Sequence, residues 1–309
     1  MQKIAILIPC HNEEITIGKV IEDFQRVLPD SVIYVCDNAS CDKTADIAYK
    51  KGAIVLSEPK MGKGYAVKKM LREVEADIYI IVDGDDTYNA EDSLKLIEMI
   101  NKGYDMVIAD RLSKDYKKIN DRRFHNLGNT LVVKMINFIF KNDIKDIMSG
   151  FRALSRRFVN HVPIESNGFE IETEMSILAF NFDFNTTQVV TSYKNRPKGS
   201  TSKLRTFTDG FKVINTIFKL FRDYRPFFFF SLISIIIFII AIALFIPIFI
   251  TYLKTGLVPK FPTLIASCSI AIVAILFFMI GLILNSITRH AKFIFNGMLK
   301  LSDIKKNRM

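Results

Sequence analysis

The chain has 309 residues and a formal net charge of +10 at pH 7, a basic excess that by itself suggests a nucleic-acid partner. Its mean hydropathy of +0.21 argues against that class, because basic soluble proteins rarely average above zero. Residues 1–200 carry 28 Lys and Arg against 29 Asp and Glu, whereas residues 201–309 carry 14 against 3, so the excess belongs to the C-terminal part and we expect no nucleic-acid partner.

The first 200 residues alternate apolar runs typical of strands with segments typical of helices. Strands are predicted over residues 3–9, 31–37, 53–57, 77–83 and 104–110, and helices over 14–28, 41–52, 63–75 and 92–103. Near-continuous apolar strands separated by helices predict an α/β domain with a mostly parallel, Rossmann-like sheet covered on both faces. We expect residues 1–200 to form this domain.

Polar side chains follow four of these strands, at the edge where such sheets bind ligands. They are His11 to Glu14, Asp37 to Ser40, Asp83 to Asp86, and Asp110 with Arg111. Acidic residues after strands usually cap helices or form turns, and we interpret Asp86 as a turn residue. Asp83 and Asp85 differ, because two carboxylates one residue apart at the end of a buried strand repel each other unless a cation compensates. One or two carboxylates plus substrate phosphates commonly hold Mg²⁺, so this pair predicts a metal site.

Other nucleotide-binding and metal-binding classes find no support in the motifs. The chain lacks the GxxxxGK[ST] phosphate loop, and no GxGxxG follows the first predicted strand. The four cysteines show neither a CxxC pair nor the histidine spacing of a zinc site, so we expect them to be reduced and incidental.

Two uncharged apolar stretches, residues 226–253 and 261–288, mark the C-terminal part. Each exceeds the roughly 20 residues that a helix needs to cross a bilayer, so a transmembrane hairpin over 226–288 is predicted rather than a buried hairpin of a soluble protein. Lys and Arg cluster on the outer flanks, whereas the connection holds only Lys254 and Lys260. The positive-inside rule then makes residues 1–200 and the basic tail 289–309 cytoplasmic parts of a multi-pass protein of the inner or plasma membrane.

Two further segments pair apolar and basic residues. Residues 201–225 interleave aromatic and aliphatic side chains with Lys and Arg, which predicts an amphipathic juxtamembrane helix beside anionic headgroups. Residues 121–140 present a broad apolar face. Either segment could instead be an ordinary core helix.

Taken together, the ordered motifs resemble a known family. They are Pro9-x-His11-Asn12-Glu13, Asp37-Asn38-x-Ser40-x-Asp42-x-Thr44, Gly62-Lys63-Gly64, Asp83-x-Asp85, Ser149-Gly150-Phe151-Arg152, Gly168-Phe169-x-x-Glu172-x-Glu174 and Arg196-x-x-Gly199-x-x-Ser202-Lys203. This order resembles the GT-A fold of family 2 glycosyltransferases. The fuller set looks like their polyprenyl-phosphate branch, which includes dolichol-phosphate mannose synthases and bacterial undecaprenyl-phosphate sugar transferases.

The resemblance implies a site for a nucleotide sugar. The residues that it assigns to that site are Pro9, His11, Glu13, Val35, Asp37, Asp83, Gly84, Asp85, Arg111, Arg196 and Lys203. It also implies Mg²⁺ or Mn²⁺ bound by Asp83 and Asp85. His11 stands where the dolichol enzymes usually carry Tyr, which leaves the partner that stacks on the base open.

The chemistry of sugar transfer is consistent with this resemblance. A departing nucleoside diphosphate is stabilised by a metal and by Arg or Lys. A lipid phosphate is largely dianionic at pH 7, by analogy with phosphoamino acids, so cationic positioning matters more than a strong general base. The residues predicted to hold that phosphate are Arg122, Arg123 and Arg152, although Arg122 and Arg123 equally fit a solvated helix start. The residues predicted to be catalytic are Asp85, Asp146, Arg152 and Arg111.

Three acidic residues keep alternative roles at this stage. Asp146 matches a position sometimes assigned as the base in this branch, and an ion pair with Arg152 would explain it equally well. Glu172 and Glu174 lie two apart on a predicted helix over 169–182 and therefore do not share a face. We expect one of the two to point into the site and the other to pair structurally.

The sequence thus predicts a membrane-bound inverting glycosyltransferase. It would move a sugar from a nucleotide-diphosphate sugar, UDP-glucose or UDP-N-acetylglucosamine, to undecaprenyl phosphate on the cytoplasmic face. A glycosyltransferase with a non-lipid acceptor and a non-catalytic membrane adaptor of a lipid-sugar pathway are the alternatives. A processive polysaccharide synthase is disfavoured, because the chain has no Trp for the Gln-x-x-Arg-Trp motif and only two spans. Because two membrane spans form only a small membrane domain, a homo-oligomer is also compatible with the sequence.

Overall fold

The structure is a computed structural model that describes residues 2–111, 133–140, 144–197, 199 and 206–306. The chain divides into two compact units, Met1–Ile217 and Phe218–Met309. The boundary between them falls within helix α9 (Thr206–Tyr224).

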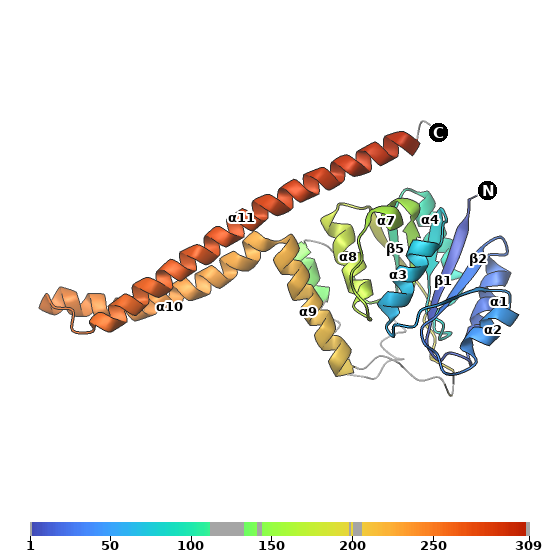
Figure 1. The fold of residues 1–309 in the computed structure, drawn as a ribbon, viewed down its shortest axis with the longest axis horizontal. Coiled ribbons are helices and arrows are strands. Elements are labelled where there is room, and N and C mark those ends of the chain that lie inside the picture. The colour runs from blue at the N-terminus through green and yellow to red at the C-terminus, as the bar shows by residue number, and fades with distance from the viewer. Residues whose placement is uncertain (1, 112–132, 141–143, 198, 200–205, 307–309) are drawn as a thin grey trace. The chain divides into compact units, whose positions relative to one another are not determined.

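The first unit is built on a sheet, to which the described residues contribute seven strands (Figure 1). The strands are β1 (Ile4–Cys10), β2 (Val32–Asp37), β3 (Ile54–Ser57), β4 (Ile78–Ile81), β5 (Met106–Asp110), β6 (Arg152–Ser155) and β7 (Thr186–Val190), in the order β3-β2-β1-β4-β6-β5-β7. Only β6 runs antiparallel to its neighbours β4 and β5 among these strands. The predicted mostly parallel sheet is therefore confirmed, with two strands, β6 and β7, that the sequence did not predict.

Helices cover both faces of this sheet. They are α1 (Ile17–Val27), α2 (Thr44–Lys50), α3 (Lys63–Glu73), α4 (Asp92–Asn101), α7 (Arg156–His161) and α8 (Ile171–Asn181), and residues 133–140 are also helical. In β1, Ile6 and Ile8 point to one face, where they share a core cluster with residues of α1 and α4. Ala5 and Leu7 point to the other face and are equally buried. Burial on both faces explains why these strands are apolar along their whole length.

The antiparallel strand β6 brings a distant part of the chain to the ligand edge of the sheet. Its first residue, Arg152, pairs in register with Ile81 of β4 and with Ile108 of β5. Because β6 runs against both neighbours, the residues just before it lie beside the carboxyl ends of the parallel strands. Ser149 and Gly150 therefore arrive next to the residues that follow β4.

The second unit is a hairpin of two long helices, α10 (Pro226–Thr255) and α11 (Phe261–Lys306), which lie side by side (Figure 1). The hydroxyl of Ser234 donates to the carbonyl of Ala274 at 2.7 Å, and Gly281 lets α11 approach Phe230. The first helix ends at Gly256, whose φ of 68° suits a residue without a side chain.

The outer surface of this hairpin is apolar. Along both helices large aliphatic and aromatic side chains are exposed, among them Ile236, Ile240 and Ile283, each about half exposed or more at 52%, 49% and 57%. Both helices are long and apolar enough to cross a membrane by length and composition. A buried hairpin of a soluble protein would enclose these side chains instead, so the exposure favours contact with lipid.

Candidate functional site

The candidate site lies at the carboxyl ends of β1 and β2. The Nδ1 atom of His11 is 2.8 Å from the carbonyl oxygen of Asn38, and the side-chain amide of Asn12 lies 3.3 Å from Nε2 of His11. A carbonyl accepts only from a protonated nitrogen, so this contact has Nδ1 of His11 donating to Asn38. The backbone N–H of Asn38 in turn donates to the carbonyl of Cys10, at 2.8 Å.

Of the other residues predicted here, Glu13 and Asp37 face this edge. Glu13 is buried, and its backbone N–H donates to the hydroxyl oxygen of Thr44 at 2.8 Å. Its carboxylate accepts from the hydroxyl of Thr16 at 3.3 Å. Asp37 ends β2, and its Oδ1 atom is buried where the described residues offer it no hydrogen-bond donor. A buried carboxylate oxygen of this kind suits a donor from a bound ligand.

Two predicted nucleotide-binding residues belong to the sheet itself. Pro9 is buried within β1 and pairs in register with Cys36. Val35 is 0% exposed within β2, between Ile8 and Val55 of the neighbouring strands. The Val35 side chain therefore packs in the core beneath the site, and a contact of this residue with the nucleotide stays a prediction.

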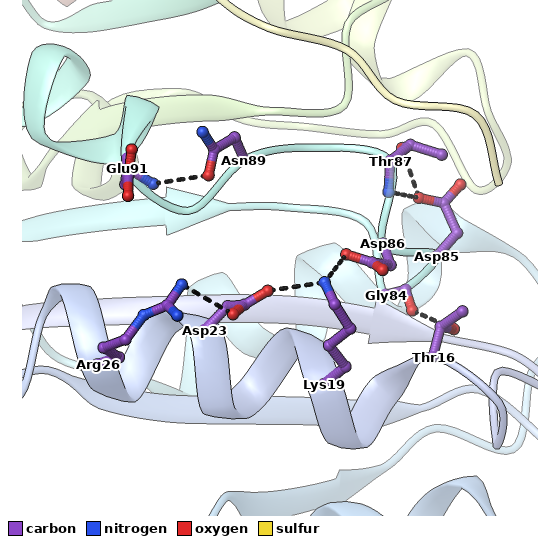
Figure 2. A network of polar contacts seen from close by, with 10 residues as sticks. All are labelled: Thr16, Lys19, Asp23, Arg26, Gly84, Asp85, Asp86, Thr87, Asn89 and Glu91. Carbon is purple, nitrogen blue, oxygen red and sulfur yellow. Dashed lines mark hydrogen bonds and ion pairs between the residues drawn. The ribbon is translucent and has the colours of Figure 1, made fainter. Parts of the chain in front are cut away.

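The segment after β4 sends its acidic side chains in different directions, as Figure 2 shows. Asp85 accepts from the hydroxyl of Thr87 at 2.6 Å and from its backbone N–H at 3.2 Å. Asp86, at a φ of 56°, instead pairs with Lys19 of α1 at 2.7 Å, which confirms it as a turn residue. The Gly84 carbonyl accepts from Thr16, and a side chain at Gly84 would meet the sulfur of Cys10 at 2.6 Å.

Asp83 is partly exposed and forms an ion-pair cluster with two nearly buried side chains, Lys63 and Glu172. Its Oδ1 atom is 2.6 Å from Nζ of Lys63, the first residue of α3, and the same Nζ is 2.5 Å from Oε1 of Glu172 in α8. Glu174 instead accepts from the backbone N–H groups of Glu165 and Ser166, at 3.0 and 2.7 Å. Glu172 thus pairs with the lysine beside Asp83, whereas Glu174 holds the loop at residues 165–166.

Arg196 forms an ion pair with Asp85. The segment that carries it runs beside the residues after Asp85, because Tyr193 bridges to Tyr88 and the N–H of Lys194 donates to the carbonyl of Thr87 at 2.8 Å. The predicted basic residue Arg196 thus reaches the predicted acidic pair.

The two carboxylates of the pair have opposite pKa shifts. Burial would raise the pKa of Asp83, but the charges of Lys63, Arg111 and Arg196 outweigh it and lower that pKa. For Asp85, burial and the negative charge of Asp83 raise the pKa, although Arg196 and Thr87 oppose the rise. The negative charges of Asp83 and Asp85 thus oppose each other, and a divalent cation would relieve that repulsion.

This donor set fits a metal that also binds substrate phosphates. Within the described part of the chain, no group of three or more His, Cys, Asp or Glu side chains is placed to enclose a metal by itself. Asp83 and Asp85 supply hard oxygen ligands, and Mg²⁺ commonly takes one or two carboxylates and completes its shell with phosphates and water.

Arg111 and Asp146 form a bidentate ion pair at the end of β5. The Nε and Nη2 atoms of Arg111 lie 2.7 and 2.9 Å from the two oxygens of Asp146, which is 0% exposed. Asp146 was expected to pair with Arg152 or to act as a base. It pairs with Arg111 instead, and an enclosed carboxylate of this kind orients Arg111 rather than meeting an acceptor.

Arg152 points into the core. It is 0% exposed, and its guanidinium donates to the carbonyls of Ser149 and Ile147 and to the hydroxyl of Ser176. Burial lowers its pKa to about 10, so it stays protonated at neutral pH. Direct contact with lipid phosphate is not compatible with this position, and we correct the predicted role to support of the turn before β6.

The remaining predicted basic residues, Arg122, Arg123 and Lys203, lie outside the described residues. Conversely, Lys63 had no predicted role, yet it contacts Asp83 and also Glu172, one of the two glutamates considered for the site. A lysine between two glycines at the start of a predicted helix was the available signal for Lys63. Nothing in the local sequence indicates that it meets Glu172, because that contact depends on how α3 and α8 pack.

Comparison with known proteins identifies the family. A family model described as "Glycosyl transferase family 2" matches residues 5–162. The chain belongs to this family. It is 34% identical over 229 residues to Glycosyltransferase AglJ of Haloferax volcanii, which covers 74% of this chain and 75% of that protein. It is 29% identical over 223 residues to a dolichyl-phosphate hexose transferase of the same organism, covering 72% of this chain and 95% of that protein.

The solved structures agree on the fold. Glucosyl-3-phosphoglycerate synthase from Mycobacterium tuberculosis, solved with Mn²⁺, UDP-glucose and phosphoglyceric acid, matches with a TM-score of 0.56 at 22% identity, over 71% of this chain and 80% of that one. The domain is therefore of the GT-A type, as expected. The chain is therefore a glycosyltransferase, an enzyme that transfers sugars. The names of its relatives are consistent with the polyprenyl-phosphate branch of the family.

Proposed function

We propose that this glycosyltransferase moves a sugar, with inversion, from a nucleotide-diphosphate sugar to a polyprenyl phosphate at the cytoplasmic face of a membrane. The observation that carries the donor half is the ion pair between Arg196 and the buried Asp85, two residues from Asp83, at the carboxyl end of the sheet. The acceptor half is supported by the relative named as a dolichyl-phosphate hexose transferase and by the two apolar helices.

The residues of the site divide the work on the donor. Asp37 and Glu13, with His11 beside them, would hold the base and ribose. Asp83 and Asp85 would hold Mg²⁺ or Mn²⁺, which supplies positive charge to the departing diphosphate. Arg111, Arg196 and Lys203 would neutralise the phosphates, with Arg196 leaving Asp85 as the donor and metal enter. We favour UDP-glucose or UDP-N-acetylglucosamine as the donor.

The acceptor side rests on charge rather than on a base. A lipid phosphate is dianionic near neutral pH and needs alignment more than deprotonation. Arg122 and Arg123 are our candidates to align it. The domain plan that goes with this proposal is a catalytic domain over 1–200, a juxtamembrane helix over 201–225, a membrane hairpin over 226–288 and a cytoplasmic tail over 289–309.

The deciding experiment measures release of nucleoside diphosphate by the full-length protein from a panel of nucleotide sugars. Polyprenyl phosphate is present or absent, and the metal is Mg²⁺, Mn²⁺ or none after EDTA. We expect turnover that requires both the lipid phosphate and the metal, with the sugar found on the lipid by mass spectrometry. Turnover without lipid would favour a non-lipid acceptor, and absence of nucleotide binding would favour the non-catalytic adaptor.

A matched pair of variants tests the metal role. Asp85→Asn removes one candidate ligand charge, and we expect a loss of turnover on the order of 10²-fold, because the leaving group loses its electrostatic stabilisation. Asp86→Asn is the control: the side chain faces Lys19, and Asn tolerates the positive φ. If both variants turn over at the wild-type rate, Asp85 does not bind the metal.

A further inference from the structure

Lys63, the first residue of α3, forms ion pairs with two carboxylates of the candidate site. The Nζ atom of Lys63 lies 2.6 Å from Asp83 and 2.5 Å from Glu172, and the side chains of Lys63 and Glu172 are 10% and 6% exposed. We propose that Lys63, anchored by Glu172, is a positioning residue that fixes the Asp83 carboxylate for the metal and the nucleotide. This inference rests on the proposed function, since it concerns the same metal site.

The backbone around Lys63 is held as tightly as its side chain. A Cβ atom on Gly62 would lie 2.3 Å from the carbonyl oxygen of Asn167, and one on Gly64 would lie 2.4 Å from that of Ser166. The start of α3 therefore packs directly against residues 165–168. Glu174 fixes that loop by accepting from two of its N–H groups, so α8 supports Lys63 twice, through Glu174 and through Glu172.

A glycine on the other side leaves room for this contact. A Cβ atom on Gly150 would lie 2.5 Å from Oδ2 of Asp83 and 2.8 Å from Nζ of Lys63. The N–H of Gly150 donates to the Tyr88 hydroxyl at 3.2 Å, and this hydrogen bond helps to hold Gly150 in place beside Lys63 and Asp83. A side chain at position 150 would therefore collide with both Lys63 and Asp83 and push them apart.

The charges explain why the arrangement serves Asp83. The ammonium of Lys63 lies between two carboxylates, 2.6 Å from Asp83 and 2.5 Å from Glu172. Its positive charge beside Asp83 offsets part of the repulsion between Asp83 and Asp85. Held between two carboxylates, Lys63 is placed to orient Asp83, a candidate metal ligand.

The test compares nucleotide affinity with and without metal. UDP binding to the full-length protein in detergent is measured by calorimetry in Mn²⁺ and in EDTA, and bound Mn²⁺ is counted by electron paramagnetic resonance. For Lys63→Met, Glu172→Gln and Gly150→Ala we expect the affinity gained from Mn²⁺ to fall about tenfold, as for residues that support a metal ligand. Affinity in EDTA should change by less than about twofold, because the nucleotide contacts themselves remain.

Gly150→Ala keeps every charged group, and Gly210→Ala is its control, because a Cβ atom at Gly210 meets nothing within 4 Å. If Lys63→Met does not fold, Gly150→Ala still tests the contact, because its added Cβ atom is expected to push Lys63 away from Asp83. Equal losses in EDTA and in Mn²⁺ would overturn the inference, since Lys63 would then act on the nucleotide or on the whole fold. An unchanged gain from Mn²⁺ in folded Gly150→Ala would overturn it too. A wild-type protein that binds UDP equally with and without Mn²⁺ would instead refute the metal site itself.

Discussion

At the scale of single residues, the Asp146 carboxylate is a fully buried charge. It accepts from the backbone N–H, Nε and Nη2 of Arg111, at 3.2, 2.7 and 2.9 Å. Removing one partner of a buried pair leaves the other charge uncompensated, at a cost of about 3–5 kcal/mol. We therefore expect Asp146→Asn to lower the free energy of unfolding by about 3 kcal/mol, the lower end of that range because Asn still accepts a hydrogen bond. Urea denaturation followed by circular dichroism measures it.

The control for this prediction is an exposed pair of the same type. Glu98 and Lys102 lie 2.6 Å apart on the surface of α4. Solvent screens such a pair, so Glu98→Gln should leave the urea midpoint unchanged. If Asp146→Asn shifts the midpoint no more than Glu98→Gln does, the Arg111 contact contributes nothing to stability.

At the scale of elements, two helical glycines should respond to alanine with opposite signs. Alanine is normally favoured over glycine in a helix by about 0.5–1 kcal/mol, and Gly210 in α9 has open space for it. A Cβ atom on Gly64 in α3 would lie 2.4 Å from the backbone oxygen of Ser166 and 2.6 Å from the backbone carbon of Asn167. Overpacking of this kind costs about 1–3 kcal/mol, so Gly64→Ala should lower the melting temperature and Gly210→Ala should not. If neither variant lowers the melting temperature, residues 165–168 move easily to make room for the added Cβ atom.

The elements also show how far the sequence could predict the fold. Strands β1, β4 and β5 were predictable because each is a run of apolar residues buried on both faces. Strands β2 and β3 are also apolar runs, although β2 is partly buried and the edge strand β3 has no buried residue. Strand β6 has four residues, Arg-Ala-Leu-Ser, with no periodicity, and its place between β4 and β5 depends on pairing with strands far away in the chain. Edge strand β7, Thr-Thr-Gln-Val-Val, is only partly buried and lacks the apolar signal of a central strand.

The candidate site was predictable to the same extent as its strands. The carboxyl ends of parallel strands meet at one edge of a sheet, so the sequence predicts that Asp37, Asp83 and Arg111 lie near one another. The partners of these residues were not predictable, because Lys63 meets Glu172 through the packing of α3 against α8. The inward turn of Arg152 likewise depends on the carbonyl groups that β6 and its preceding turn present to it.

At the scale of the whole molecule, the cysteines report on sidedness. Cys41 is exposed in the first unit, whereas Cys10 and Cys36 are buried. Burial raises the pKa of Cys36 to about 12 and that of Cys10 well above its usual range, so neither offers a reactive thiolate at neutral pH. Cys268 lies in the apolar part of α11, where lipid would surround it. A membrane-impermeant maleimide should therefore label Cys41 in inside-out vesicles and leave intact cells unlabelled.

Cys41→Ser is the matched variant for this measurement, and it should abolish the label in inside-out vesicles. Labelling of intact cells that disappears in Cys41→Ser would put the first unit on the outer side and contradict the proposed topology. Label that persists in Cys41→Ser would show that Cys268 is reached from water.

The antiparallel course of β6 has a consequence for how the protein is made. A ribosome releases Lys63, Asp83 and Asp85 early, whereas Gly150, Glu172 and Arg196 follow only after β5 and much of the later chain. The acidic half of the site is thus synthesised before the residues that complete it, and its closure depends on contacts of large sequence separation, which form slowly. We expect the nascent chain to acquire nucleotide affinity in one late step, once the segment carrying Arg196 has left the exit tunnel.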